Sequence, residues 1–171
     1  MFRLSVLFLI AAVGISGCMP TGENGVTRIT ERQADSIRLN QLDLVNAVRA
    51  SAGAPALTLS AELTAAAETH ARDMASQLRA WNFGSDRSSP QTRAERAGFD
   101  GLITSEDVAE TFLDNVGIFQ AWISDPRVRK AMQNPSATHM GLGWYQEESG
   151  KIWWVMDIGA ANGAVRVARA E

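Results

Sequence analysis

The chain contains a single cysteine, Cys18, among its 171 residues, so it cannot form an internal disulfide. Its folded domain must therefore be held together by packing rather than by cross-links. No apolar run of about 18 residues follows the N-terminal segment, so we expect no transmembrane helix further along the chain. Positive charge is also in short supply, because 16 Lys and Arg face 19 Asp and Glu. This balance argues against a nucleic-acid partner, whose phosphates require clustered basic residues.

Residues 1–17 have the pattern of a secretory signal peptide. Arg3 supplies a positive charge, and an almost wholly apolar run from Leu4 to Val13 follows it. This run is too short to span a bilayer comfortably. The segment ends in Ile15-Ser16-Gly17-Cys18, which resembles the lipobox of bacterial lipoproteins.

The lipobox resemblance implies cleavage before Cys18 and lipidation of its sulfur and new amino group, which would anchor the protein to a membrane. The alternative is a plain secretory signal with an incidental free cysteine. Met19, rather than Asp, follows the cysteine, and this favours the outer membrane, facing the periplasm, over inner-membrane retention. Residues 18–33 are then the lipidated N-terminus and a flexible tether, because they are rich in Gly, Thr, Pro and Asn.

The remaining sequence predicts one domain over residues 34–160, followed by a tail at 161–171. Expected helices cover residues 34–51, 61–78, 90–98, 110–124 and 126–133, and residues 99–108 are expected to form a loop or a short strand. The segments HMGLGWYQ and KIWWVMDIG read as a hairpin. The second of them is apolar on both faces, which predicts a central strand covered on both sides. Helices followed by an antiparallel hairpin indicate an α+β fold.

Five segments, in this order and at these intervals, carry a family resemblance. They are LVNAVRASAGAPALTLSAEL, AAAETHARDMA, SSPQTRAERAGF, SEDVAETF and AWISDPRVRKAMQNPSATHMGLGW. Together they resemble the CAP superfamily, or SCP domain, of cysteine-rich secretory, antigen 5 and pathogenesis-related 1 proteins, in its bacterial branch. The resemblance covers roughly residues 42–159. It implies an α-β-α sandwich, in which a small antiparallel sheet lies between helical layers.

Family members often share a cleft with two histidines and acidic residues, which sometimes binds a divalent metal. Matched to that pattern, one histidine position falls on Asn82 and the other on Val128. The glutamate of the family's Gly-Glu-Asn segment falls on Glu106, and the arginine after the second histidine falls on Arg129. Asparagine is a poor zinc ligand and cannot act as a base, and valine can do neither. We therefore expect no bound metal and no cofactor.

The chain has only two histidines. His139 begins the penultimate strand, where it either converges with Asn82 and Glu106 in the cleft or is a polar strand-edge residue bonded to a neighbouring loop. His70 lies on the apolar stripe of the second helix and is expected to be a core residue rather than a ligand. Glu106 is expected to accept structural N–H bonds, with a catalytic role as the alternative.

These observations predict a cell-envelope lipoprotein with a degenerate CAP domain. It would bind an envelope ligand or partner without catalysis, through a cleft formed by Asn82, Glu106 and His139, while lipidated Cys18 holds it on the membrane. One alternative is a divergent hydrolase that uses Glu106 and His139 as an acid–base pair. Another is a lipid-binding protein, which requires an apolar groove between helices. Resemblance of fold does not name the ligand.

Overall fold

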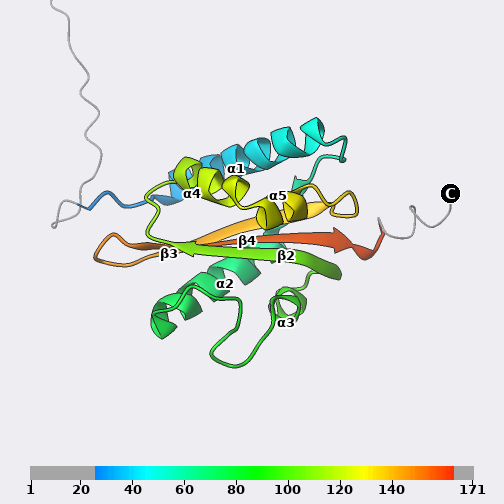
Figure 1. The fold of residues 1–171 in the computed structure, drawn as a ribbon. Coiled ribbons are helices and arrows are strands. Elements are labelled where there is room, and N and C mark those ends of the chain that lie inside the picture. Colours follow the sequence, from blue (N-terminus) through cyan, green and yellow to red (C-terminus); the bar gives the residue numbers. More distant parts are fainter. Residues whose placement is uncertain (1–25, 164–171) are drawn as a thin grey trace, which may run out of the picture.

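The computed structural model describes residues 26–163, so the predictions for the signal peptide, Cys18 and the last residues of the tail lie outside it. The elements are α1 (Glu31–Ser51), β1 (Thr58–Leu59), α2 (Ala61–Gln77), α3 (Pro90–Arg96), β2 (Gly101–Glu110), α4 (Asn115–Ser124), α5 (Pro126–Met132), β3 (His139–Gln146) and β4 (Ile152–Ala161). The sheet lies between α1, α4 and α5 on one face and α2 and α3 on the other, which confirms the α-β-α sandwich (Figure 1). None of the described helices combines the length and apolar composition that crossing a membrane requires.

The four described strands are ordered β1-β3-β4-β2, so β4 lies inside the sheet. It pairs antiparallel with β3 and with β2, whereas the two-residue β1 runs parallel to β3. All of β4 is buried except its last residue, which confirms the prediction of a central strand covered on both sides. Because side chains alternate along a strand, Trp154 and Met156 pack toward α1 and α4, while Trp153 and Val155 pack toward α2.

The alanine-rich helix α2 packs directly on β3. A methyl group built on Gly141 would overlap the main chain of Leu63 and Thr64, and one built on Gly143 would overlap the main chain of Glu68. The two glycines therefore allow the helix to contact the strand without intervening side chains. This close approach fixes where every side chain on the inner face of α2 lies relative to the sheet.

The first family segment, LVNAVR, ties α1 to the loops beside it. Asn46 accepts a hydrogen bond from the main-chain nitrogen of Leu57 at 2.8 Å and donates to its carbonyl at 3.1 Å. Arg49 is fully buried and donates to the carbonyls of Met132 and Ala137, at 2.5 Å and 3.0 Å. A buried guanidinium needs such acceptors, and these bonds fix the connection between α5 and β3.

The predicted boundary between strand and helix after residue 99 is wrong. Residues 101–110 form a ten-residue strand rather than a loop or short strand, because their pairing with β4 continues as far as Glu110 opposite Trp153. The next helix begins at Asn115 instead of residue 110, since the Asp114 side chain accepts a hydrogen bond from the main-chain nitrogen of Gly117 at 2.7 Å and caps it.

The later start of the helix changes which side chains are exposed. The apolar spacing of the expected helix at 110–124 predicts that Phe112, Val116 and Phe119 face inward, with Trp122 or Ile123. Phe119 and Trp122 are buried as predicted, together with Ile118. Phe112 and Val116 are exposed, because Phe112 lies before the helix and Val116 lies on its outer side.

The strand β2 forms one edge of the sheet, and two side chains cap part of that edge. Gln91 donates to the carbonyl of Gly101 at 3.0 Å and accepts from the main-chain nitrogen of Ile103 at 2.8 Å. Asn82 donates to the carbonyl of Glu106 at 2.8 Å. Main-chain groups that would otherwise be open to another strand are therefore bonded within the domain.

We expect Gly143→Ala to lower the free energy of unfolding by about 1–3 kcal/mol, because the added methyl would overlap main-chain atoms that cannot move aside. Urea unfolding followed by tryptophan fluorescence measures this change. The control is Gly163→Ala, whose methyl would have no atom within 4 Å. Equal stability of the two variants would contradict the close packing of α2 on β3.

Candidate functional site

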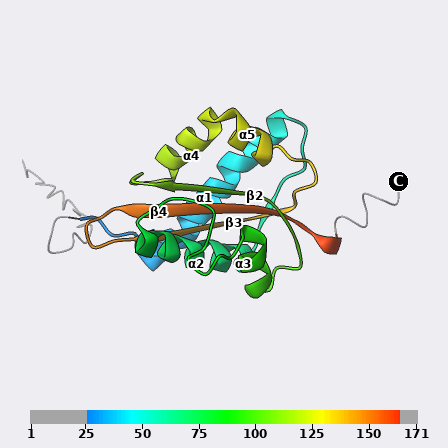
Figure 2. The ribbon, with the colours of Figure 1, turned by 60° about the horizontal axis from the view of Figure 1, so that its bottom comes forward.

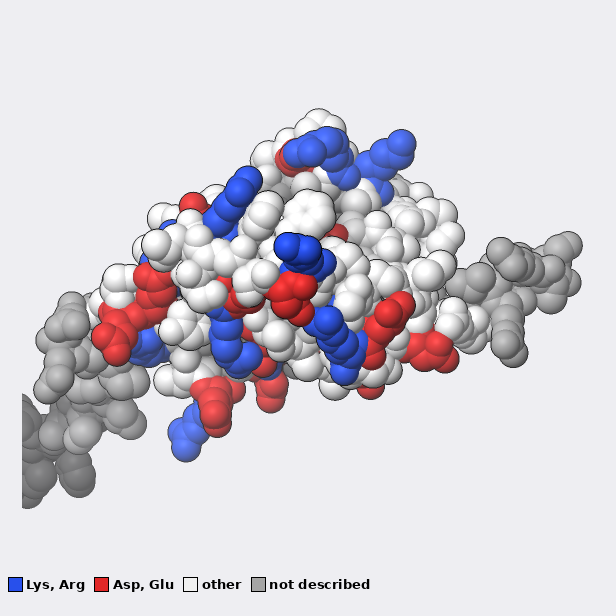
Figure 3. Space-filling view, turned by 90° about the horizontal axis from the view of Figure 1, so that it is seen from below, with Lys and Arg blue, Asp and Glu red and all other residues white. Residues whose placement is uncertain are grey.

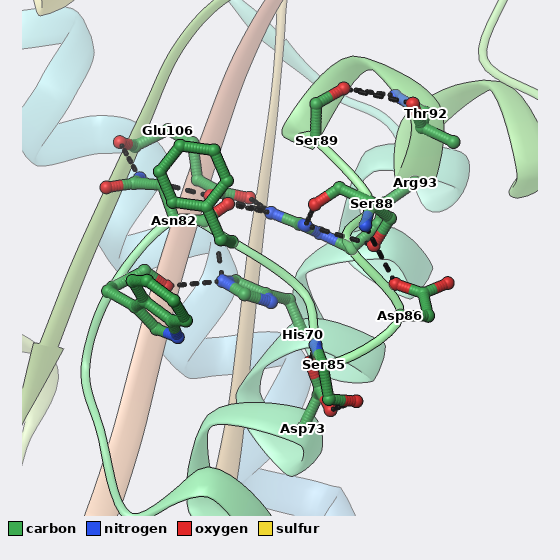
Figure 4. Close-up of polar contacts among 12 residues, drawn as sticks. His70, Asp73, Asn82, Ser85, Asp86, Ser88, Ser89, Thr92, Arg93 and Glu106 are labelled. Atoms are coloured by element: carbon green, nitrogen blue, oxygen red, sulfur yellow. Dashed lines mark hydrogen bonds and ion pairs between the residues drawn. The ribbon is translucent and has the colours of Figure 1, made fainter.

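Glu106, on β2, has a buried carboxylate that accepts hydrogen bonds from two other side chains of the domain. Arg93 Nη2 donates to both of its oxygens, at 2.6 Å and 2.8 Å, and Asn82 Nδ2 donates to Oε1 at 3.0 Å. The Glu106 side chain is 1% exposed and that of Arg93 is 5% exposed. Figure 4 shows Arg93, from α3, and Asn82, from the preceding loop, converging on Glu106.

Two further titratable side chains lie against this ion pair. Asp157 faces Glu106 across the β2–β4 pairing, and burial together with the negative charge of Glu106 raises its pKa well above the ordinary value. His70 on α2 is fully buried, and desolvation lowers its pKa. Burial disfavours the charged form of both groups, whereas Arg93 and Glu106 form the ion pair of this cluster.

The loop between α2 and α3 carries Asn82, and α2 holds this loop at two points. Neutral His70 lies with Nε2 2.8 Å from the carbonyl of Trp81, a distance that assigns the proton to Nε2 as donor. Asp73 accepts from the main-chain nitrogen of Ser85 at 2.8 Å and from its hydroxyl at 2.6 Å. His70 and Asp73 of the segment THARDM therefore hold the loop that carries Asn82. This arrangement supports the prediction that His70 is a core residue.

A cleft of about 450 Å³ lies beside Glu106, between β2 and the helices α4 and α5. Its lining includes Asn82, Asp107, Trp122, Arg127 and Val128. Val128, at one of the two expected histidine positions, packs against the hydrophobic core. Burial raises the pKa of Asp107 to about 6. Arg127 is paired with Asp125 at 2.7 Å at the exposed side of the cleft.

The structure brings together two of the three residues expected in the cleft. Asn82 and Glu106 are in contact, but His139 lies on β3, which is separated from β2 by β4. Gly159 is the residue of β4 that pairs with His139, and the ring of Phe99 packs over it. Phe99 therefore occupies the space between His139 and β2. His139 instead bonds the Thr138 hydroxyl through Nδ1 at 2.8 Å. Among the described residues no hydrogen bond or ion pair links His139 to Glu106.

The side chains at the site do not fit a metal. Within residues 26–163 no three His, Cys, Asp or Glu side chains are grouped as metal ligands. Both oxygens of Glu106 already accept bonds from Arg93, and a guanidinium in this position would repel a cation. Asn82 and Val128 add no strong ligand.

Sequence reasoning missed Arg93 and Asp157. Asp157 is the only charged residue in the apolar run IWWVMDI, and a carboxyl group in a strand expected to be buried signals a buried polar partner. Arg93 follows Pro90 by three residues on a short helix. Nothing in the local sequence distinguishes it from the exposed Arg96, so its burial is a consequence of tertiary packing.

Acidic and basic side chains are intermixed on the face formed by α2 and α3 (Figure 3). The helix α3 carries one buried arginine, Arg93, and one exposed arginine, Arg96, which form a matched pair for mutation. We expect Arg93→Met to lower the free energy of unfolding by about 3–5 kcal/mol, because it leaves Glu106 charged and buried without its partner. Arg96→Met removes an ion pair to Asp86 that is more than half exposed, and should cost about 1 kcal/mol or less. Chemical denaturation compares them, and equal losses would show that the buried pair contributes no more than a surface one.

A family model described as CAP, the cysteine-rich secretory protein family, matches residues 42–158. Among curated proteins, YkwD of Bacillus subtilis (strain 168) is 27% identical over 118 residues, which cover 69% of this chain and 45% of YkwD. The chain therefore spans less than half the length of this relative. The membrane protein YlbC of the same organism is 26% identical over 116 residues, covering 66% of this chain and 34% of YlbC.

Two solved structures have a similar fold. An extracellular protein containing an SCP domain from Bacillus anthracis gives a TM-score of 0.67 at 20% identity, over 78% of this chain and 44% of that chain. An outer surface protein from Borrelia burgdorferi gives 0.66 at 14% identity, over 79% and 97%. At such identities these similarities concern the fold alone. The match to the family model, which covers more than half of the chain, identifies the chain as a member of the CAP, or cysteine-rich secretory protein, family.

Proposed function

We propose that this chain is an exported, lipid-anchored CAP domain that binds a ligand or partner in the cell envelope without catalysing a reaction. Export is supported by the N-terminal signal pattern and by the description of two structural relatives as extracellular and outer surface proteins. Anchoring to a membrane, with the outer membrane favoured, rests on the lipobox-like segment that ends at Cys18.

The observation that carries the non-catalytic proposal is the enclosed state of Glu106. A general acid or base must come within hydrogen-bond distance of the group it serves. The Glu106 carboxylate is 1% exposed and is held by Arg93 and Asn82. The alternative hydrolase would pair it with His139, which lies on the far side of β4.

Two polar atoms of residues that line the cleft beside Glu106 lack a partner. Among the described residues, Asp107 Oδ2 and Trp122 Nε1 are buried without a hydrogen bond, and both residues line the cleft. One is an acceptor when ionised and the other is a donor. Buried polar groups are normally paired, so the proposed ligand carries both a donor and an acceptor, as an amide or a sugar hydroxyl does, and reaches these atoms when the side chains that cover them move aside.

Ala121→Arg tests whether the cleft holds the occupant. Ala121 lines the cleft, so the long charged side chain should occupy it and abolish binding. Gln120→Arg, at the neighbouring exposed position of α4, is the control and should retain binding. The measurement is mass spectrometry of molecules that copurify with, or cross-link to, each variant in the native envelope.

Two results would count against a non-catalytic cleft. In one, both arginine variants would retain the same bound molecules as the parent protein, which would place the occupant elsewhere. In the other, the purified protein would hydrolyse ester, peptide or glycan substrates, and Glu106→Gln would abolish that activity.

The raised pKa of Asp107 also makes a prediction about stability. A carboxyl group whose pKa is higher in the folded state, here about 6, binds protons more tightly when folded and therefore opposes folding once it is ionised. This penalty is absent below the unfolded pKa of about 4 and complete above about pH 6. Asp107→Asn should therefore stabilise the domain at pH 7.5, on the order of 1–2 kcal/mol, and change little at pH 4.

Thermal unfolding at both pH values measures this effect. The matched control is Asp43→Asn, which changes an exposed carboxylate on α1 and should have almost no effect at either pH. A loss of stability at pH 7.5 in Asp107→Asn would instead mean that the ionised carboxylate is favourably bonded within the domain.

A further inference from the structure

The loop between β2 and α4 presents apolar side chains to solvent. Leu113 is 79% exposed and Val116 is 50% exposed. Phe112 and, on α1, Leu39 are also exposed. Asn40, next to Leu39, accepts a hydrogen bond from Asn115 at 2.7 Å, so the two segments lie side by side. We call Leu39, Phe112, Leu113 and Val116 the apolar rim.

The loop that carries Phe112 and Leu113 of the apolar rim is held in place by hydrogen bonds on both sides. Thr111 has φ of 81°, a left-handed conformation that is unfavourable for a β-branched residue. Its nitrogen donates to the carbonyl of Ile152 at 2.9 Å, and the carbonyl of Phe112 accepts from Trp154 Nε1 at 2.8 Å. Asp114 caps α4 immediately afterwards. Strain retained at a position fixed by so many bonds points to a functional surface.

The rim lies at the end of the domain where the N-terminal segment arrives. Val26 and Leu113 line the same groove, which has a volume of about 750 Å³. Arg28 and the nitrogen of Ile29 bond Gln146 at 3.1 Å and 3.0 Å, beside the β3–β4 hairpin. Figure 2 shows the start of the described chain, the hairpin and the end of β2 together at one end of the molecule.

The distance from the proposed lipid to the domain is short. Cys18 precedes Val26 by eight residues, which span at most about 28 Å even when fully extended. A domain of this length is about 35–40 Å across. A lipid on Cys18 would therefore keep the end that bears the rim close to the bilayer, whatever conformation the intervening residues adopt.

We propose that the apolar rim, with Leu113 at its tip, docks on the surface of the membrane that holds Cys18. This inference rests on the anchoring part of the proposed function. The groove beside Leu113 has charges of both signs: its lining includes Asp114, Arg28 and Lys151, and Lys151 is paired with Glu110 at 2.6 Å. Docking therefore relies on insertion of apolar side chains at the interface, to a depth of about 5–10 Å, rather than on attraction to anionic lipids, and suits zwitterionic phospholipids.

A weak contact is sufficient for this docking. A short tether gives the attached surface an effective concentration in the millimolar range, so a few apolar side chains can remain engaged although they would not bind vesicles by themselves. Docking would also fix how the cleft between β2 and α4 faces the envelope.

Site-specific fluorescence in vesicles tests the proposal. The lipidated full chain carries no free thiol, because its single cysteine is the lipidated one. Leu113→Cys can therefore be labelled selectively with an environment-sensitive fluorophore and reconstituted into zwitterionic vesicles that contain spin-labelled phospholipid. The label should shift to shorter emission wavelength and be quenched several-fold.

The control is Leu102→Cys, because Leu102 is 60% exposed and lies at the opposite end of β2 from Glu110. Its label should remain unquenched, and adding Val116→Glu to Leu113→Cys should reduce quenching at position 113 without a change in circular dichroism. Equal quenching of the labels at positions 102 and 113 would overturn the docking. So would a label at position 113 whose emission shifts to shorter wavelength without quenching by the spin-labelled lipid, because that result indicates pairing with a second copy of the chain.

The two levels of the proposal fail differently. Mass spectrometry that finds no lipid on Cys18, with the Cys18→Ala chain fractionating like the parent, would overturn the anchor and the docking together. A lipidated chain with an unquenched label at 113 would overturn the docking alone.

Discussion

The buried ion pair between Arg93 and Glu106 is the interaction on which the rest of this site depends. It joins α3 to β2, and Asn82 extends it to the loop that follows α2. Two unlike charges can be buried here because Arg93 also donates to the carbonyls of Ser88 and Asn82. Burial, and then the negative charge of Glu106, raise the pKa of the neighbouring Asp157 well above its ordinary value.

The site therefore looks catalytic in composition but not in arrangement. A carboxylate, a histidine and an arginine are all present, yet the carboxylate is bonded to the arginine and all three side chains are buried. The neighbouring cleft is lined by Glu106 and Asn82 together with Asp107 and Trp122. The proposed ligand would be selected there by hydrogen bonding.

The sequence predicts the architecture well, because apolar periodicity and family segments act together. The hairpin, α2 and the central strand lie almost to the residue where the pattern predicts them. The boundary between β2 and α4 does not lie where the pattern predicts it. The segment GLITSEDVAE has no clear strand pattern of its own, and it forms a strand because it pairs with β4. The contact of Asn82 with Glu106 follows from the family pattern. The distance of His139 from Glu106, and the burial of Arg93, depend on how strands are ordered and helices packed, which no local pattern encodes.

The side chains of Gln91 and Asn82, which bond main-chain groups of β2, would have a further effect in a chain held on a membrane. Anchored molecules diffuse in two dimensions, with their long axes constrained, and meet one another far more often than free molecules do. A bare edge strand under these conditions is a template for sheet-to-sheet association. Gln91 and Asn82 occupy main-chain groups of this edge, and at the opposite edge β1 pairs with the first two residues of β3. On a membrane, the bond from Asn82 to the carbonyl of Glu106 would help to prevent this edge from pairing with a neighbouring copy.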